Sequence, residues 1–372
     1  YTLPTADGTA NQVLTTDGSG AVTFADAGGG GGADLYVANE SSPAAQPTAA
    51  GANAIGIGDT AQAAGADGVA IGLQSYARAQ SALGLFGDAQ STESICIGKG
   101  SAVTADGGVQ LGRNGYATAV DAVSLGKSRA SGASSFAAAI NNNTSSYGAS
   151  GANSVAIGSQ ARAYSTGSQA IGNSAFASGT SALSLGNASS ASGTKSIAIG
   201  NSTATAYLAS SFGEYALSES QGKYSYASGR FGSTEGSAQT GTYVLRADTT
   251  DATPEGLTTR NNGGVQSDNQ VNLPNNSAYG FTGTIIARED SAATNDFAVW
   301  EVKGGAVRAA SAATTALGSY NINKISESTG AATWAIAISA DTTNGAIAFT
   351  VTGEASHSIR WVATINTTEV TY

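Results

Sequence analysis

The side chains that most often do chemistry are scarce in this sequence of 372 residues, which holds one histidine, His357, and one cysteine, Cys96. A zinc site of the usual kind needs several Cys or His ligands, so these two residues predict no metal centre. A Ser-His-Asp triad could use only His357, and no Gly-x-Ser-x-Gly elbow occurs in a strand-helix setting. We expect His357 to be an exposed or interface residue, and Cys96 to be a small buried one.

Two other patterns suggest chemistry at first sight. "LGKS", residues 125 to 128, ends like a phosphate-binding loop, but Asp121 stands where the earlier glycine is needed and no helix follows. Paired carboxylates could cleave a glycan, and the C-terminal third holds Asp248, Asp251, Glu255, Glu289, Asp290, Asp296 and Glu301. We expect these to be solvated loop charges, with calcium at Asp248, Asp251 and Glu255, or glycan contact, as alternatives. The sequence thus predicts no catalytic residue, no metal and no cofactor.

Charge and composition exclude several partners. The net charge is −10, from 16 Lys and Arg against 26 Asp and Glu, and this argues against nucleic-acid binding, which needs a basic surface. No run of eighteen apolar residues occurs, so a membrane-spanning helix is not expected. The chain holds 50 Gly and no Met, and it begins at Tyr1, so we expect a fragment or a processed form.

An apolar residue followed by glycine recurs every fourteen residues through much of the chain. The fourteen-residue spacing changes at "SALGLFG" near Leu85, and the repeat is interrupted at residues 141 to 147, "NNNTSSY". The apolar members, which we expect to form the core of the repeat, are Ile57, Ile71, Ile97, Leu111, Leu125, Ile157, Ile171, Leu185 and Ile199. The turn glycines are Gly58, Gly72, Gly98, Gly112, Gly126, Gly158, Gly172, Gly186 and Gly200.

Each fourteen-residue unit predicts two short strands and two tight turns. "VAI" at residues 69 to 71 alternates with a period of two, and half a unit earlier Ala61-Gln62-Ala63 alternates with small residues. Glycine after the first strand supplies a backbone angle that other residues reach only at a cost. Stacked units make a parallel β-roll of about eleven coils, roughly 50 Å long at one strand spacing per coil. Such a roll is thin, and we expect several chains to pack side by side.

One outward column of the roll is aromatic and polar. Tyr76, Tyr116 and Phe176 share this column with Gln62, Arg162 and Ser190. Packing between subunits and a sugar-binding face both explain such a column.

The two ends differ from the repeat. Residues 1–27 read as a connector module with turns at Asp7-Gly8 and Asp17-Gly18, and residues 28–33, which include five consecutive glycines, as a linker. The roll occupies residues 34–241. Longer alternating strands such as "GFTGTIIARED" and "SIRWVATINTTEV" fill residues 242–372 and predict a β-sandwich knob, jelly-roll-like. The overall fold class is all-β.

"NSVAIG" at Asn153 to Gly158, followed by S-x-A-x-A, resembles the head repeat of the YadA-type trimeric adhesins, over about Asn53 to Gly213. The resemblance implies a left-handed roll and a homotrimer. Members of that family end in a coiled-coil stalk and a membrane anchor, whereas this sequence ends in "WVATINTTEVTY". Tail fibres of phages, marine ones especially, carry the same roll, and the N-terminal module and the knob resemble theirs.

These features together predict a virion tail fibre that attaches to the host cell surface by multivalent, non-catalytic binding. The expected partners are two further copies of the chain, other tail or baseplate proteins, and a glycan or protein receptor on the host. The receptor-binding residues are unknown, with the knob favoured. The alternatives are a bacterial surface adhesin or extracellular fibre subunit, and a glycan depolymerase.

Overall fold

The computed structural model describes residues 2–6, 8–9, 12–16, 18–26, 46–138, 146–261, 264–290 and 295–372. The described residues form strands and two short 3-10 helices, η1 (Ala312–Thr314) and η2 (Thr329–Ala331). β1 (Gln12–Thr16) and β2 (Val22–Asp26) make an antiparallel hairpin, and Gly18 in its turn has φ +77°. The expected linker at residues 28–33 lies outside the described residues. No described helix is long and apolar enough to cross a membrane.

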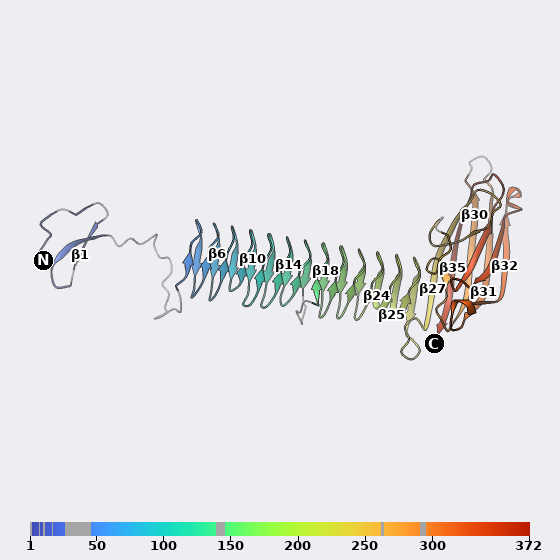
Figure 1. Ribbon diagram of the computed structural model, residues 1–372, viewed down its shortest axis with the longest axis horizontal. Coiled ribbons are helices and arrows are strands. Elements are labelled where there is room, and N and C mark those ends of the chain that lie inside the picture. Colours follow the sequence, from blue (N-terminus) through green and yellow to red (C-terminus); the bar gives the residue numbers. More distant parts are fainter. Residues whose placement is uncertain are drawn as a thin grey trace.

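The all-β parallel solenoid predicted by the repeat is confirmed, with about twelve turns (Figure 1). Each coil contributes one strand to each of two parallel sheets. The first sheet contains β4 (Ile55–Ile57), β6 (Val69–Ile71), β8 (Leu83–Leu85), β10 (Ile95–Ile97), β12 (Val109–Leu111), β14 (Val123–Leu125), β16 (Phe136–Ala138), β18 (Val155–Ile157), β20 (Gln169–Ile171), β22 (Leu183–Leu185) and the start of β24 (Ile197–Ala204).

The second sheet is built from two-residue strands. These are β3 (Thr48–Ala49), β5 (Gln62–Ala63), β7 (Tyr76–Ala77), β9 (Asp88–Ala89), β11 (Ala102–Val103), β13 (Tyr116–Ala117), β15 (Arg129–Ala130), β17 (Gly148–Ala149), β19 (Arg162–Ala163), β21 (Phe176–Ala177) and β23 (Ser190–Ala191). β25 (Ser210–Ser218) and β26 (Tyr224–Ser228) continue the stack.

The interior of the roll holds small residues, and this corrects the expectation that the large apolar row forms its core. In β6, Ala70 is fully buried, while Val69 and Ile71 on either side are only partly buried. The same pattern repeats from coil to coil, and Leu111 and Leu185 are 40% and 39% exposed. A fourteen-residue coil brings its two sheets so close that only Ala, Ser, Gly or Cys fit between them at nearly every level. The large residues therefore point outward.

The large residues make a continuous apolar ladder along the outer side of the first sheet. Parallel pairing places Ile157 beside Ile171, Ile171 beside Leu185, and Leu185 beside Ile199. The row ends on aromatic rings, because Ile199 pairs with Phe212 and Phe212 with Tyr226. We call the outward row that contains Ile57, Ile71, Ile97, Leu111, Leu125, Ile157, Ile171, Leu185, Ile199, Phe212 and Tyr226 the apolar ladder.

Two larger residues, Val103 and Gln110, do enter the interior, and glycines make room for them; a Cβ at Gly108 would lie 2.7 Å from Cγ1 of Val103. Gln110 in β12 is fully buried, and its side-chain amide donates to the carbonyls of Gly112 and Gly126 at 3.2 and 3.1 Å. A Cβ atom at Gly115 would lie 2.2 Å from that amide nitrogen. Cys96 is accommodated in the same way, since a Cβ at Gly87 would lie 2.6 Å from its sulfur. A larger side chain in the interior is thus matched by a glycine close to it, so the packed volume between the two sheets stays nearly constant.

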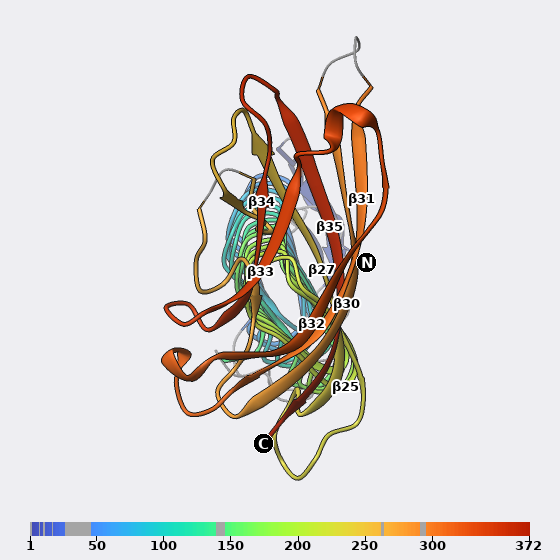
Figure 2. The ribbon, with the colours of Figure 1, turned by 90° about the vertical axis from the view of Figure 1, so that its right-hand side faces the viewer.

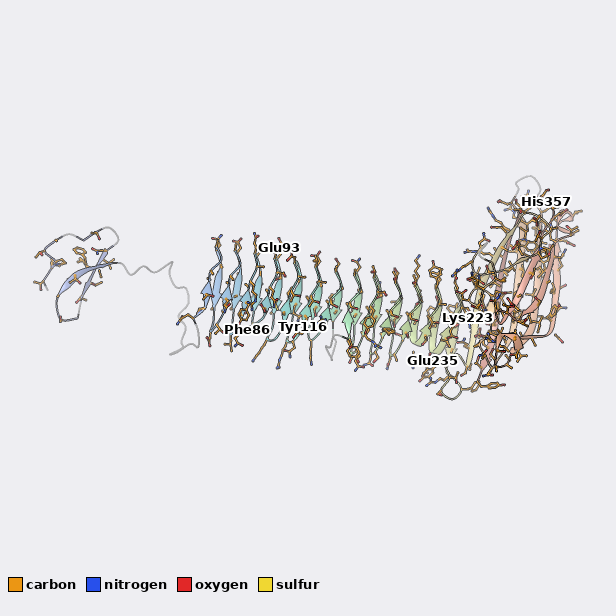
Figure 3. All side chains as sticks on the ribbon, viewed as in Figure 1. Phe86, Glu93, Tyr116, Lys223, Glu235 and His357 are labelled. Carbon is orange, nitrogen blue, oxygen red and sulfur yellow. The ribbon has the colours of Figure 1, made fainter. Side chains whose placement is uncertain are left out.

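Both edges of the roll turn through the left-handed backbone region. All nine predicted turn glycines have positive φ, from +69° at Gly126 to +135° at Gly172. Many other turn residues do as well, for example Asn153 at +55° and Leu208 at +57°. Figure 3 shows two of these turn residues, Phe86 and Glu93, on opposite edges of the roll. The glycine pattern therefore identified only part of the turns.

The roll passes directly into the knob through a shared sheet. β26 is parallel to β25 but antiparallel to β27 (Ala238–Thr249), with Tyr224 opposite Thr242 and Tyr226 opposite Thr240. The first knob strand therefore starts before residue 242, the expected boundary. A five-stranded antiparallel sheet follows in the order β27, β35 (Ile359–Thr371), β30 (Ser277–Glu289), β31 (Phe297–Arg308) and β32 (Ala316–Glu327).

A second, smaller sheet covers the inner face of that one (Figure 2). Its central strand β34 (Ala346–Thr352) pairs with β33 (Ala335–Asp341) on one side, and with β28 (Glu255–Gly256) and β29 (Val271–Asn272) on the other. The two sheets share one core, in which Trp361 stacks on Trp300 at 5.6 Å and Phe281 meets Phe349 edge to face. The knob therefore has a core of large apolar residues, whereas the interior of the roll is built mainly from small ones.

Candidate functional site

The outer face of the five-stranded knob sheet carries a polar groove. Strand pairing aligns Thr242, Asn366, Thr282, Lys303 and Asn321 in one row across the five strands. The alternation of the strands forces these side chains outward, because their neighbours fill the core between the sheets. Figure 2 shows the five strands side by side.

The next row along the strands aligns Val244, Thr364, Thr284, Glu301 and Asn323. Residues of both rows line a groove of about 290 Å³. We call the outward residues of this groove, Thr282, Thr284, Glu301, Lys303, Asn321, Thr364 and Asn366, the polar face. They offer hydroxyls, amides, one carboxylate and one ammonium group.

The chemistry available on the polar face is hydrogen bonding and single-charge contact. Glu301 is the one acidic residue among those that line the groove, whereas glycoside hydrolysis by the usual route needs two carboxyl groups that flank the bond. Side chains of this kind are suited to sugar hydroxyls, which both donate and accept hydrogen bonds. From its sequence, Glu301 was expected to be a solvated loop charge. The Thr and Asn residues carry no distinguishing signal in the sequence, because outward Thr and Asn are typical of any half-exposed strand.

Two of the other acidic candidates, Asp248 and Asp290, meet at Arg360, whose guanidinium lies 4.0 and 2.8 Å from their carboxylates. Asp296 instead accepts a hydrogen bond from Ser328 at 2.6 Å. The backbone amide of Thr253 donates to Asp251 at 2.7 Å, and this bond lowers the pKa of that carboxyl. Within the described residues no three His, Cys, Asp or Glu side chains form a group that could hold a metal, Asp248, Asp251 and Glu255 included.

His357 lies at the end of the knob far from Lys223 at the junction with the roll (Figure 3). Its Nδ1 is 2.9 Å from Oε1 of Glu289, which is largely buried, while the His357 side chain is 36% exposed. The carboxylate orients the ring as it would for a general base. His357 and Glu289 are not among the residues that line the groove of the polar face.

Cys96 is fully buried inside the roll, and burial raises the pKa of its thiol to about 11. The thiolate is therefore scarce near neutral pH, and the residue acts as a small interior side chain. Residues 125–128, the "LGKS" segment, form the end of β14 and the turn after it, where the Ser128 hydroxyl donates to the Leu125 carbonyl at 2.6 Å.

The aromatic and polar column predicted on the roll runs along the outer side of the second sheet, opposite the apolar ladder. Pairing places Gln62 beside Tyr76, Tyr116 beside Arg129, and Phe176 between Arg162 and Ser190. The structure therefore separates two outward surfaces, one apolar throughout its length and one mixed.

No family model matches the chain, and no curated protein matches it. Among solved structures, the chain is similar to the tailspike protein of Acinetobacter baumannii bacteriophage Fri1, a capsular polysaccharide depolymerase, at 9% identity and a TM-score of 0.23. It is also similar to the tailspike protein of Acinetobacter baumannii phage AM24, at 12% identity and a TM-score of 0.19. These matches cover 76% and 78% of this chain, which spans 57% and 54% of those tailspikes. Sequence identities and TM-scores this low do not assign a role to any residue of this chain.

The comparison contradicts two expectations from the sequence. Non-catalytic attachment was the predicted function, and the chain was predicted not to be an enzyme. The first of these tailspikes is described as a polysaccharide depolymerase, which is an enzyme.

Proposed function

We propose that this chain is part of a phage tail appendage directed at a polysaccharide of the host surface, which the polar face binds as its substrate. The observation that carries the proposal is the polar face itself, which lies on the knob at one end of the roll. Its two rows place Thr and Asn side chains beside Glu301 and Lys303. Neighbouring strands are about 4.8 Å apart, a spacing comparable to one sugar ring, so a glycan lying across the strands would meet a polar side chain at each ring.

The polysaccharide proposal is tested on host capsule or other surface polysaccharide with the full chain. We expect binding in calorimetry that weakens about tenfold when Asn366 and Lys303 are both replaced by alanine, because each loses a hydrogen-bonding or charged contact. Thr250→Ala is the matched control, because this exposed residue follows β27 and is not among those that line the groove. Size-exclusion chromatography of the same polysaccharide after incubation reads out cleavage. Parent protein that neither binds nor shortens the polysaccharide would refute the proposal.

We further propose that the roll is a YadA-like head repeat, that the knob is a β-sandwich, and that three chains associate along the apolar ladder. The ladder repeats at coil spacing over the length of the roll, so a second copy of the same roll is a partner of matching length and period. Exposed apolar surface of this extent is characteristic of an interface. Because Tyr224 and Tyr226 lie opposite Thr242 and Thr240, the polar face continues the ladder face. In a trimer the groove would therefore lie beside the neighbouring chain. Other tail proteins as partners and a marine host remain predictions.

The proposed trimer predicts a solution mass of three times 36.4 kDa by light scattering. Replacing Ile157 and Ile171 by aspartate should shift the mass toward one chain, because two charges would then be buried in each apolar interface. Replacing Gln62 and Ser190, on the opposite surface, by aspartate should leave the mass unchanged. A parent protein with the mass of a single chain would contradict the trimer.

A further inference from the structure

A cluster of three aromatic rings and one arginine stands on the mixed surface of the roll. The Arg162 guanidinium lies 4.5 Å from the ring centroid of Phe176 and 5.8 Å from that of Tyr147. Tyr164 meets Phe176 edge to face, with 5.5 Å between centroids, and its hydroxyl donates to the Ser146 carbonyl at 2.7 Å. Tyr164 is 40% exposed, so the cluster presents an aromatic wall to solvent beside a cation. We call these four residues the Arg162 cluster.

The charge of Arg162 is not neutralised within the described part of the chain. No ion pair of Arg162 occurs there, and its Nε is buried without a hydrogen-bond partner. The adjoining segment, residues 139 to 145, contains no Asp or Glu in its sequence. Because the guanidinium has no carboxylate partner among the described residues, an anionic acceptor supplied from outside would be favoured.

A second arginine on the same surface shows the contrasting case. Arg78 lies 4.2 Å from the centroid of the Tyr76 ring, but its Nε pairs with Asp88 at 2.7 Å, and Gln90 also donates to Asp88 at 2.7 Å. Asp88 follows Tyr76 in the outward column as Phe176 follows Arg162. Both arginines therefore lie over an aromatic ring, but in the described part of the chain only Arg78 of the two has a carboxylate beside it.

We propose that the Arg162 cluster is a second carbohydrate-binding site, on the shaft, for a carboxylated sugar such as a uronate. The sugar ring would stack on the aromatic wall, and its carboxylate would pair with the Arg162 guanidinium. The site lies on the sheet opposite the apolar ladder, so association along the ladder leaves it open. The inference rests on the proposed polysaccharide function, because it assigns an acidic sugar to the same polymer.

The experiment uses the full chain and two probes of equal length, an oligogalacturonate and a neutral malto-oligosaccharide. In calorimetry at low salt we expect the oligogalacturonate to bind more tightly than the neutral probe, and its binding to weaken with added salt. Arg162→Gln should weaken oligogalacturonate binding about tenfold, and Tyr164→Ala should weaken the binding of both probes. Arg78→Gln is the matched control. It should change the binding of neither probe, since Arg78 is already paired with Asp88.

For each variant, a thermal unfolding midpoint close to that of the parent protein verifies that the roll is intact. If Arg162→Gln binds oligogalacturonate like the parent, or if Arg78→Gln weakens it equally, the second site is refuted. The polysaccharide function is tested separately by the Asn366 and Lys303 variants. If those variants lose host polysaccharide while Arg162→Gln keeps both probes, the proposed function stands and the second site fails.

Discussion

Replacing Glu369 by alanine is expected to lower the free energy of unfolding by about 3–5 kcal/mol, because it leaves a buried lysine without its counter-charge. Glu369 in β35 accepts from Lys223 Nζ at 2.6 Å, and the two side chains are 0% and 4% exposed. Gln239 and Thr367 also donate to its carboxylate, at 2.7 and 2.6 Å. Lys223 comes from the turn before β26, so this pair joins the roll to the knob.

The measurement is denaturant unfolding at a fixed protein concentration, so that association does not shift the midpoint. Glu327→Ala is the control, because Glu327 forms an ion pair of the same 2.6 Å length with Lys324 on a more exposed surface. Exposed pairs contribute about 0–1 kcal/mol. Lys223→Met combined with Glu369→Leu should recover much of the loss, since no charge is then left buried. If Glu369→Ala and Glu327→Ala lowered the free energy of unfolding equally, the pair of Lys223 and Glu369 would contribute no more stability than a surface pair.

Replacing Gly172 by alanine is expected to cost more than about 3 kcal/mol, through both backbone strain and collision with the next coil. Gly172 has φ +135°, and a Cβ there would lie 2.1 Å from the Gly186 carbonyl oxygen. Because every coil pairs with its neighbours, a shift at this level disturbs the stacking on both sides. Thermal unfolding followed by circular dichroism measures the loss.

Gly126→Ala provides the matched control within the same set of turn glycines. Gly126 has φ +69°, and a Cβ there would meet nothing within 4 Å. Its replacement should cost about 1–2 kcal/mol, the penalty of the left-handed region alone. If the two alanine variants were equally stable, contact between successive glycines would not limit the spacing of the coils.

The knob shows what the alternation of residues along a strand predicts and what it does not. The alternating segments "GFTGTIIARED" and "SIRWVATINTTEV" predicted strands, and they coincide with most of β30 and β35. Alternation also separates the outward residues of each strand from the inward ones. It does not say which strands become neighbours, so the row of Thr242, Asn366, Thr282, Lys303 and Asn321 could not be assembled from the sequence. Strand order is set by long-range pairing, and a local pattern carries no information about it.

The sequence by itself determined the period, the parallel stacking and the positions of the turn glycines, because these depend on local alternation and on backbone angles that glycine adopts freely. Only the tertiary structure decided which row of the roll is interior. Alternation identifies two faces of a strand, but the distance between the two sheets selects the face that fits inside. Here that distance admits Ala70 and excludes Ile71, so the large apolar residues form an outer surface, and Arg162 with its aromatic neighbours lies on the opposite one.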